Sequence, residues 1–274
     1  MSTQHRICPL CEATCGLKIE TEGRRVTRIE GDNEDTFSEG YICPKGAALA
    51  ELDADPDRLR APRIRDGKSF REATWDEAFA HINEHLTRIR DQHGPNSVAI
   101  YLGNPIVHNI ALTAYVPALA KALNTRNAYS ASTVDQFPKQ LASALMFGTG
   151  LSVAVPDIDR THYMLILGAN PLVSNGSMMT APNFPGRLRR LRQRGGKVVV
   201  IDPRRTKTAD AADEHHFIRP GTDAFLLFAI VSTIFEEGLA KPGPIAEHTS
   251  GIDEVRRLAK AFTPERVASR CGIN

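Results

Sequence analysis

The chain has 274 residues, 42% of them hydrophobic, and carries 34 basic against 32 acidic side chains. This length accommodates one large or two ordinary domains of about 100–200 residues each. The near balance of charge gives no reason to expect nucleic acid as a partner. The longest apolar run, residues 225–235, is about half of the roughly 20 residues that span a bilayer, so we expect no membrane insertion.

The N-terminus shows neither the apolar core of a secretory leader nor a twin-arginine motif. We therefore expect a cytoplasmic location. Thiols stay reduced in that compartment, and clustered cysteines there hold metal more often than they form disulfides.

Four of the five cysteines lie in the first 43 residues, and they are Cys8, Cys11, Cys15 and Cys43. Iron–sulfur clusters are commonly held by such a set, in which one short loop supplies three thiolates and a distant residue the fourth. Zinc also accepts four cysteines, but its sites usually use two short pairs. The spacing favours [4Fe–4S] and leaves zinc as the alternative. Cys271 is predicted to be a buried thiol without a chemical role.

Next along the chain, "LKIETEGRRVTRIEGD" predicts a β-hairpin that turns at Gly23. The cysteines therefore belong to a small antiparallel lobe, to which we assign residues 1–60. Residues 74–93 then predict a helix, because Thr74 and Glu77 form a capping-box pattern and Gly94-Pro95 ends the apolar periodicity.

The remaining elements alternate between strands and helices. "SVAIYLGN" predicts a buried strand, "IALTAYVPALAKALN" a helix, and "HYMLILGANP" a strand that runs into a loop. "FPGRLRRLRQRGG" predicts an exposed basic helix, "KVVVIDPRRT" a third strand, and "TDAFLLFAIVSTIFEEG" an apolar helix. Such alternation is typical of parallel βαβ units. The predicted fold class is α/β, with the antiparallel lobe followed by a doubly wound, mostly parallel α/β domain over residues 61–274.

Ligands of doubly wound sheets bind beyond the carboxyl ends of the strands, where three loops carry polar side chains. Asn170, Asp202 and Asp223 are candidates for ribose hydroxyls or a guanine edge, and Arg204 and Thr206 are candidates for phosphate. Each loop also has an ordinary structural interpretation, as a turn or a helix cap. The sequence lacks a complete G-x-G-x-x-G after a strand, which argues against an ordinary dinucleotide site.

Taken in order, the cysteine pattern ending in Cys43-Pro44-Lys45-Gly46, then "TWDEAF", "GANP", "DPRRT" and "PGTD", resembles the molybdopterin oxidoreductase family. This group contains formate dehydrogenases, nitrate reductases and polysulfide reductases, and the resemblance covers the chain from His5 onward. It implies a [4Fe–4S] cluster beside molybdenum or tungsten, which is held by a bis-molybdopterin guanine dinucleotide cofactor.

The resemblance also implies roles for residues outside the cysteine pattern. Lys45 would lie between cluster and pterin and stabilise negative charge during electron transfer, the alternative being a solvated surface lysine. The family takes its metal ligand from a region that contains no cysteine here, so Asp135 is the first candidate and Ser132 the second. Either would be a hard oxygen ligand that favours oxo transfer. Asp135 could instead cap the helix that begins near Phe137. Formate dehydrogenases of this family place a histidine directly after the ligand, whereas this chain has Gln136.

Three functions follow as alternatives. The chain is a molybdopterin-dependent oxidoreductase, or a molybdenum-free electron-transfer subunit of the same fold, or a zinc-stabilised binding module without redox activity. The first is our prediction, with a small-molecule substrate. Its expected partner is a redox protein or a C-terminal half of the cofactor cage. Members of the family are longer than 274 residues, so we expect a fragment or split subunit in which the sheet and the apolar helix of residues 225–235 lack part of their cover.

Overall fold

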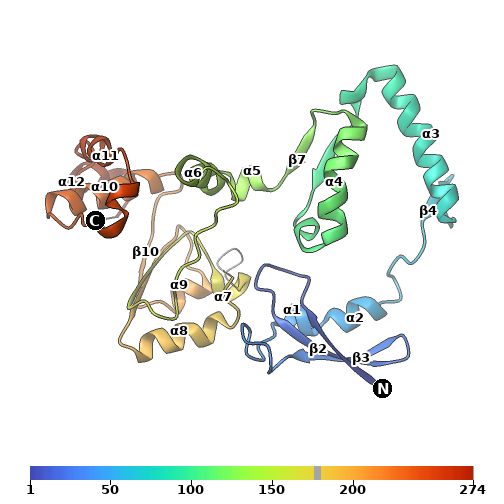
Figure 1. Cartoon of the computed structure of the whole chain (residues 1–274), viewed down its shortest axis with the longest axis horizontal. Helices are drawn as coiled ribbons and strands as arrows, with labels where there is room; N and C mark the ends of the chain where they lie inside the picture. The colour runs from blue at the N-terminus through green and yellow to red at the C-terminus, as the bar shows by residue number, and fades with distance from the viewer. Residues whose placement is uncertain (176–179, 274) are drawn as a thin grey trace. The chain divides into compact units, whose positions relative to one another are not determined.

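The structure is a computed structural model that describes residues 1–175 and 180–273. The chain forms two compact units (Figure 1). The first comprises residues 1–156 and 180–183, and the second comprises residues 157–175 and 184–273.

The first unit begins with a three-stranded antiparallel sheet of β1 (Ser2–Ile7), β2 (Gly16–Glu22) and β3 (Arg25–Gly31), in that order. The predicted hairpin is confirmed, because Glu22 pairs with Arg25 and Gly23 supplies a φ of +59° at the turn. β1 was not predicted, since its side chains are all exposed and show no apolar alternation. The short helices α1 (Pro44–Ala47) and α2 (Leu49–Ala54) lie against β3 (Figure 1).

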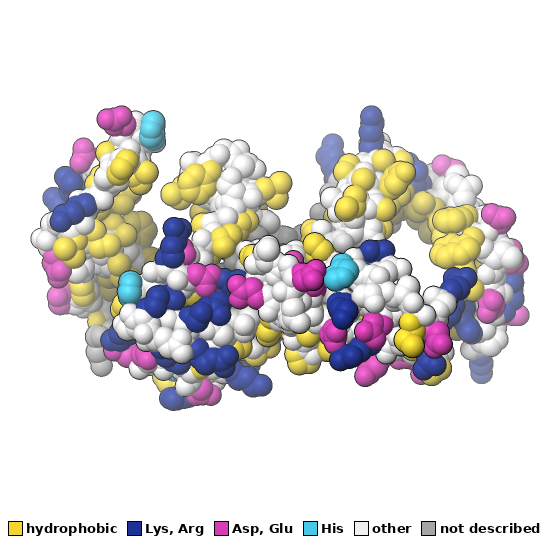
Figure 2. Space-filling view, turned by 60° about the horizontal axis from the view of Figure 1, so that its bottom comes forward, with side chains coloured by type: hydrophobic (Ala, Val, Ile, Leu, Met, Phe, Trp, Pro, Cys, Tyr) yellow, Lys and Arg dark blue, Asp and Glu magenta, His cyan; other side chains and the backbone are white. Residues whose placement is uncertain are grey.

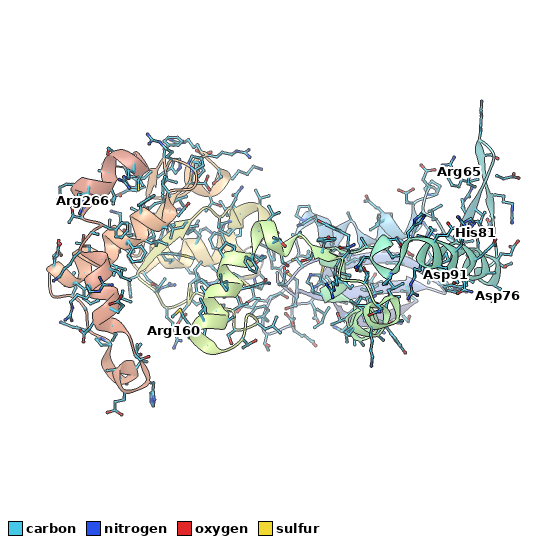
Figure 3. The ribbon with its side chains drawn as sticks, turned by 90° about the horizontal axis from the view of Figure 1, so that it is seen from above. Arg65, Asp76, His81, Asp91, Arg160 and Arg266 are labelled. Carbon is cyan, nitrogen blue, oxygen red and sulfur yellow. The ribbon has the colours of Figure 1, made fainter. Side chains whose placement is uncertain are left out.

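A second hairpin, β4 (Arg63–Asp66) and β5 (Ser69–Glu72), precedes the long helix α3 (Trp75–His93). The capping box is present as predicted. Thr74 Oγ1 accepts the Glu77 N–H at 3.2 Å, and Glu77 Oε2 accepts the Thr74 N–H at 2.8 Å. Gly94 ends the helix with a φ of +79°. Asp76, His81 and Asp91 lie along α3 and are exposed (Figure 3).

The described part of the rest of the first unit contains one parallel strand pair, three α-helices (α) and two 3₁₀ helices (η). Its elements are η1 (Pro95–Ser97), β6 (Ile100–Leu102), η2 (Asn104–His108), α4 (Ile110–Leu123), β7 (Ala128–Ser130), α5 (Ser132–Asp135) and α6 (Phe137–Phe147). The prediction of a buried strand here was wrong in one respect: β6 has three residues and none is buried. Apolar side chains of α4 and α6 reach the surface (Figure 2), among them Ile110, Tyr115, Leu145 and Met146.

The second unit is built on a parallel sheet of β8 (Tyr163–Leu167), β9 (Lys197–Ile201) and β10 (Glu214–His216), in the order β10-β9-β8. Its helices are α7 (Pro171–Ser174), α8 (Phe184–Gln193), α9 (Lys207–Asp210), α10 (Asp223–Glu236), η4 (Gly243–His248), α11 (Ile252–Ala259) and α12 (Pro264–Cys271). The central strand is buried from Val198 onward, as its run of β-branched residues predicts.

Helix α8 is not the exposed basic helix that its arginines suggest. Phe184, Leu188 and Leu191 recur at helical spacing and are buried. Burying one such side chain contributes about 1.5–3 kcal/mol. A surface ion pair, such as Arg190 with Asp159 at 3.6 Å, contributes about 0–1 kcal/mol, so the apolar positions decide how the helix packs.

The apolar helix α10 is partly covered, since Ala229 and Ser232 are buried whereas Leu227 and Ile234 are 45% and 36% exposed. Ala229 is buried together with Val267 and Cys271 of α12, and Phe228 stacks on Phe262 at 4.8 Å. Cys271 is 1% exposed, which confirms the predicted buried thiol. No helix among the described residues has the length and apolarity to cross a membrane.

The fold class is therefore confirmed as α/β, with a small antiparallel lobe followed by helices and parallel strands. Among the described residues the parallel strands are distributed over two sheets, one of three strands and one of two. The division of the chain at residue 60 stays a prediction.

Candidate functional site

The four N-terminal cysteines come from two segments of the small lobe, the loop between β1 and β2 and the start of α1. Cys8 follows β1, Cys15 precedes β2, and the Cys8 N–H donates to the Cys15 carbonyl at 2.9 Å. Thr14, with a φ of +47°, turns the intervening loop back toward Cys11. Cys43 stands at the N-cap of α1. Cys8, Cys15 and Cys43 are buried and Cys11 is half-buried, so the loop carries its thiols inward.

The thiols lie close enough to influence one another's ionisation. Burial, and after it the negative charge on Cys8, Cys11 and Cys43, raises the pKa of the Cys15 thiol to about 11. Among the residues that the structure describes, no three His, Cys, Asp or Glu side chains are placed to share a single metal ion.

Asp35 and Ser38 connect the loop between β3 and Cys43 to Gly16, which directly follows Cys15. Asp35 Oδ2 accepts hydrogen bonds from the N–H and the hydroxyl of Ser38, both at 2.6 Å, and these hold the pKa of the carboxyl below its usual value. Ser38 Oγ in turn accepts the Gly16 N–H at 3.0 Å. A Cβ on Gly16 would lie 2.5 Å from the Asp35 Cβ, so only glycine allows this approach after Cys15.

Asp32 makes a second set of hydrogen bonds, at the start of the same loop. Its backbone N–H donates to the Gly16 carbonyl and its carbonyl accepts the Gly40 N–H, each at 3.0 Å. Its Oδ2 lies 2.7 Å from His5 Nδ1, and this hydrogen bond lowers the pKa of the carboxyl. Together these two sets of contacts position the loop that leads to Cys43.

Lys45 is exposed on α1, two residues after Cys43. The helix approaches Cys8 closely, since a Cβ on Gly46 would lie 3.7 Å from the Cys8 Sγ. Burial raises the pKa of the Cys8 thiol, whereas the positive charge of Lys45 acts in the opposite direction. Lys45 is thus exposed, as the alternative of a surface lysine expects, and its role in electron transfer stays a prediction.

The two candidate metal ligands of the molybdenum site lie on α5. Ser132 begins this short helix and is half-buried, and Asp135 ends it and is exposed. Neither side chain makes a hydrogen bond or ion pair with another described residue. Gln136, and not Asp135, occupies the N-cap of α6, so the capping alternative for Asp135 was wrong.

The structure brings the loops after β8 and β9 together. Asn170 stands at the N-cap of α7, and its Oδ1 accepts a hydrogen bond from the Thr208 hydroxyl at 2.7 Å. Thr208, which is 1% exposed, also accepts the Leu172 N–H at 3.2 Å. Asn170, predicted as a direct ligand, therefore has a structural partner as well.

Asp202 directly follows β9 and is 7% exposed. One of its oxygens, Oδ1, accepts the Arg204 N–H at 2.8 Å. Strand β10 holds its backbone, because its N–H donates to the His216 carbonyl and its carbonyl lies 3.1 Å from His215 Nε2. The two histidines lie on this strand and support the loop.

The remaining candidates are placed as follows. Arg204 is exposed. Thr206 caps α9 by accepting the Ala209 N–H at 3.1 Å. Asp223 is the exposed first residue of α10. Asn170, Asp202, Arg204 and Thr206 thus lie at the carboxyl ends of β8 and β9, while Asp223 belongs to the later loop after β10.

Sequence reasoning missed the residues that hold these loops. The acidic, turn-forming run "GDNED" before Ser38 indicates a turn in which Asp35 accepts hydrogen bonds. Thr208 gave none, because its partners lie 36 and 38 residues away.

Comparison with known proteins agrees with this geometry. A family model described as molybdopterin oxidoreductase matches residues 58–262, and one described as molybdopterin oxidoreductase Fe4S4 domain matches residues 1–52. The fold resembles that of acetylene hydratase from Pelobacter acetylenicus, with a TM-score of 0.79 and 21% identity over 99% of this chain and 37% of that one.

Curated relatives give the same result. The F420-dependent formate dehydrogenase subunit alpha of Methanocaldococcus jannaschii is 30% identical over 98% of this chain and 38% of its own length. The nitrate reductase of Symbiobacterium thermophilum is 30% identical over 98% and 36%, respectively. This chain thus spans somewhat over a third of the length of these relatives. With the two family models covering the cysteine lobe and most of the remainder, the chain belongs to the molybdopterin oxidoreductase family and contains its Fe4S4 domain.

Proposed function

We propose that Cys8, Cys11, Cys15 and Cys43 bind a [4Fe–4S] cluster in a molybdopterin-dependent oxidoreductase. The observation that carries this assignment is the gathering of four thiols in one lobe, mostly buried and within electrostatic reach of one another. When bound, the pterin-held metal supplies two-electron chemistry and the cluster passes electrons singly.

Lys45 is proposed as the residue that eases the passage of electrons. Each added electron makes the thiolate-ligated cluster more negative, and the ammonium group opposes that charge. Its effect on the Cys8 thiol supports this role.

The loops after β8 and β9 are proposed to bind the guanine nucleotide part of the cofactor. Asp202 supports this because its carboxylate is buried and only Oδ1 accepts a hydrogen bond from the described residues. Oδ2 is therefore available to accept from a ribose hydroxyl or a guanine N–H. Asn170 supplies a donor, while Arg204 and Thr206 are proposed to meet phosphate, and Asp223 to contribute from the loop after β10.

For the substrate, we propose a small molecule that gives or accepts an oxygen atom. Asp135, or failing it Ser132, would provide an oxygen ligand to the metal. Gln136 stands where formate dehydrogenases of the family place a histidine, which argues against formate. The name "subunit alpha" of the Methanocaldococcus relative supports a partner subunit as the electron acceptor or donor.

The test is elemental analysis of the holoenzyme with Cys43→Ser, using Cys271→Ser as the matched control. We expect about four irons and four acid-labile sulfides per chain in the parent, together with molybdenum or tungsten. Cys43→Ser should lose the iron and the brown absorbance. Cys271→Ser should keep both, because Cys271 belongs to the α10–α12 core.

Other outcomes would identify the alternatives. Iron without molybdenum or tungsten would indicate an electron-transfer subunit, and zinc alone would indicate a binding module without redox activity. Full iron content in Cys43→Ser would refute the ligand assignment.

A further inference from the structure

Asn170 and Thr208 cap two short helices reciprocally. The first N–H groups of a helix have no partner inside it. In α9, the Thr208 N–H is directed at Asn170 Oδ1, at 3.3 Å. In α7, the Leu172 N–H donates to Thr208 Oγ1, at 3.2 Å. Each helix thus receives an acceptor from a side chain at the start of the other helix.

This arrangement fixes the direction of the Asn170 amide. The Thr208 hydroxyl accepts from Leu172, so its single hydrogen is left for Asn170 Oδ1, at 2.7 Å. Oδ1 therefore faces two donors of Thr208. Turning the amide over would place its NH₂ group against the Thr208 N–H, where two donors would oppose each other.

The NH₂ group of Asn170 consequently points away from Thr208. It makes no hydrogen bond with any residue that the structure describes, and Asn170 is half-buried. Thr208, by contrast, is 1% exposed, so no water competes for its hydrogen bonds. The loop after β8 therefore presents a donor of fixed direction.

We propose that Thr208 is a positioning residue for cofactor retention. It acts through Asn170, keeping the amide NH₂ directed at an acceptor oxygen of the bound nucleotide. This inference rests on the proposed function, in which those loops bind the guanine nucleotide.

The test measures guanine nucleotide released on acid denaturation of the holoenzyme, per chain. Thr208→Val keeps the shape and removes the hydroxyl, and we expect roughly tenfold less nucleotide. Thr208→Ser restores the hydroxyl and should restore the content to within about twofold of the parent. Asn170→Asp keeps an acceptor toward Thr208 but loses the NH₂ donor, and it should also release roughly tenfold less nucleotide.

A double-mutant cycle separates positioning from general stabilisation. If Thr208 acts through Asn170, adding Thr208→Val to Asn170→Ala should change nucleotide content by less than about twofold. A further fall as large as in the parent background would overturn the proposal, as would full nucleotide content in Thr208→Val or in Asn170→Asp. A parent holoenzyme that contains no guanine nucleotide would overturn the proposed nucleotide site and this inference together.

Discussion

The Asp35 carboxylate accepts two hydrogen bonds from Ser38 and its side chain contacts Gly16, so this residue connects the loop before Cys43 to the start of β2. Hydrogen bonds to a charged acceptor contribute about 1.5–3 kcal/mol each to stability. A single residue outside the cysteine pattern therefore has a large share in placing the fourth thiol.

We predict that Asp35→Asn destabilises the cysteine lobe by about 1–2 kcal/mol, because a neutral amide oxygen accepts less strongly than a carboxylate. Urea denaturation followed by the absorbance of the cluster would measure the change. Asp57→Asn is the control, since Asp57 is exposed and its side chain makes no hydrogen bond with the described residues.

The same carboxylate predicts a pH dependence. The pKa of Asp35 in the folded chain is lowered, so its contribution is fully present above the ordinary Asp value of about 3.9. It is lost as the pH falls through the lower folded value. The stability difference between parent and Asp35→Asn should thus be constant from pH 7 to about pH 5 and shrink below about pH 4. A difference that stays unchanged below pH 3 would contradict the assignment.

Among the elements, α3 depends most on its own termini. None of its residues is buried, and Phe79 and Ile82 of its apolar side are 60% and 54% exposed. Tertiary packing usually supplies most of a helix's stability. For α3, capping therefore carries more weight than it does in α8, where two leucines and a phenylalanine are buried.

We predict that Thr74→Ala lowers the local stability of α3 by about 1 kcal/mol. The change leaves the Glu77 N–H without its acceptor and releases the reciprocal bond. Hydrogen exchange of the α3 amides should accelerate about fivefold, which is what 1 kcal/mol gives. Thr74→Ser should exchange as the parent does. Equal protection of α3 in the parent and in Thr74→Ala would show that other contacts hold the helix.

At the scale of the whole molecule, the two units have separate cores. In the first, the cysteine lobe packs Ala13 and Leu17 around its thiols. In the second, the core is formed by the buried residues of β9 and by Ala229, Val267 and Cys271. A small lobe whose core includes cysteine thiols is expected to depend on its metal for stability.

Removal of iron should therefore affect the units differently. After chelation under reducing conditions, we predict at least tenfold faster hydrogen exchange in β1–β3 and less than twofold change in β8–β10. The parallel sheet serves as the internal control, because no cysteine of the cluster lies in its unit. Equal loss of protection in both sheets would show that the cluster stabilises the chain as a whole.

Local order was largely encoded in the sequence. The turn at Gly23, the capping box at Thr74 and the apolar run of β9 each depend on residues a few positions apart, and the structure contains each as predicted. The Asp135, Ser132 and Lys45 roles stay predictions, since they depend on a bound cofactor.

Only the tertiary structure decided the rest, and the reason is sequence separation. Thr208 forms a hydrogen bond with Asn170, 38 residues away, and Gly16 with Ser38, 22 residues away. No local sequence pattern predicts these two hydrogen bonds. β1 has no apolar alternation of its own and becomes a strand because β2 offers it a hydrogen-bonding edge. By itself the sequence determined which residue types could bind a cluster and a nucleotide. Folding decided which of them point at a ligand, because the direction of a side chain depends on the partner that long-range contacts bring to it.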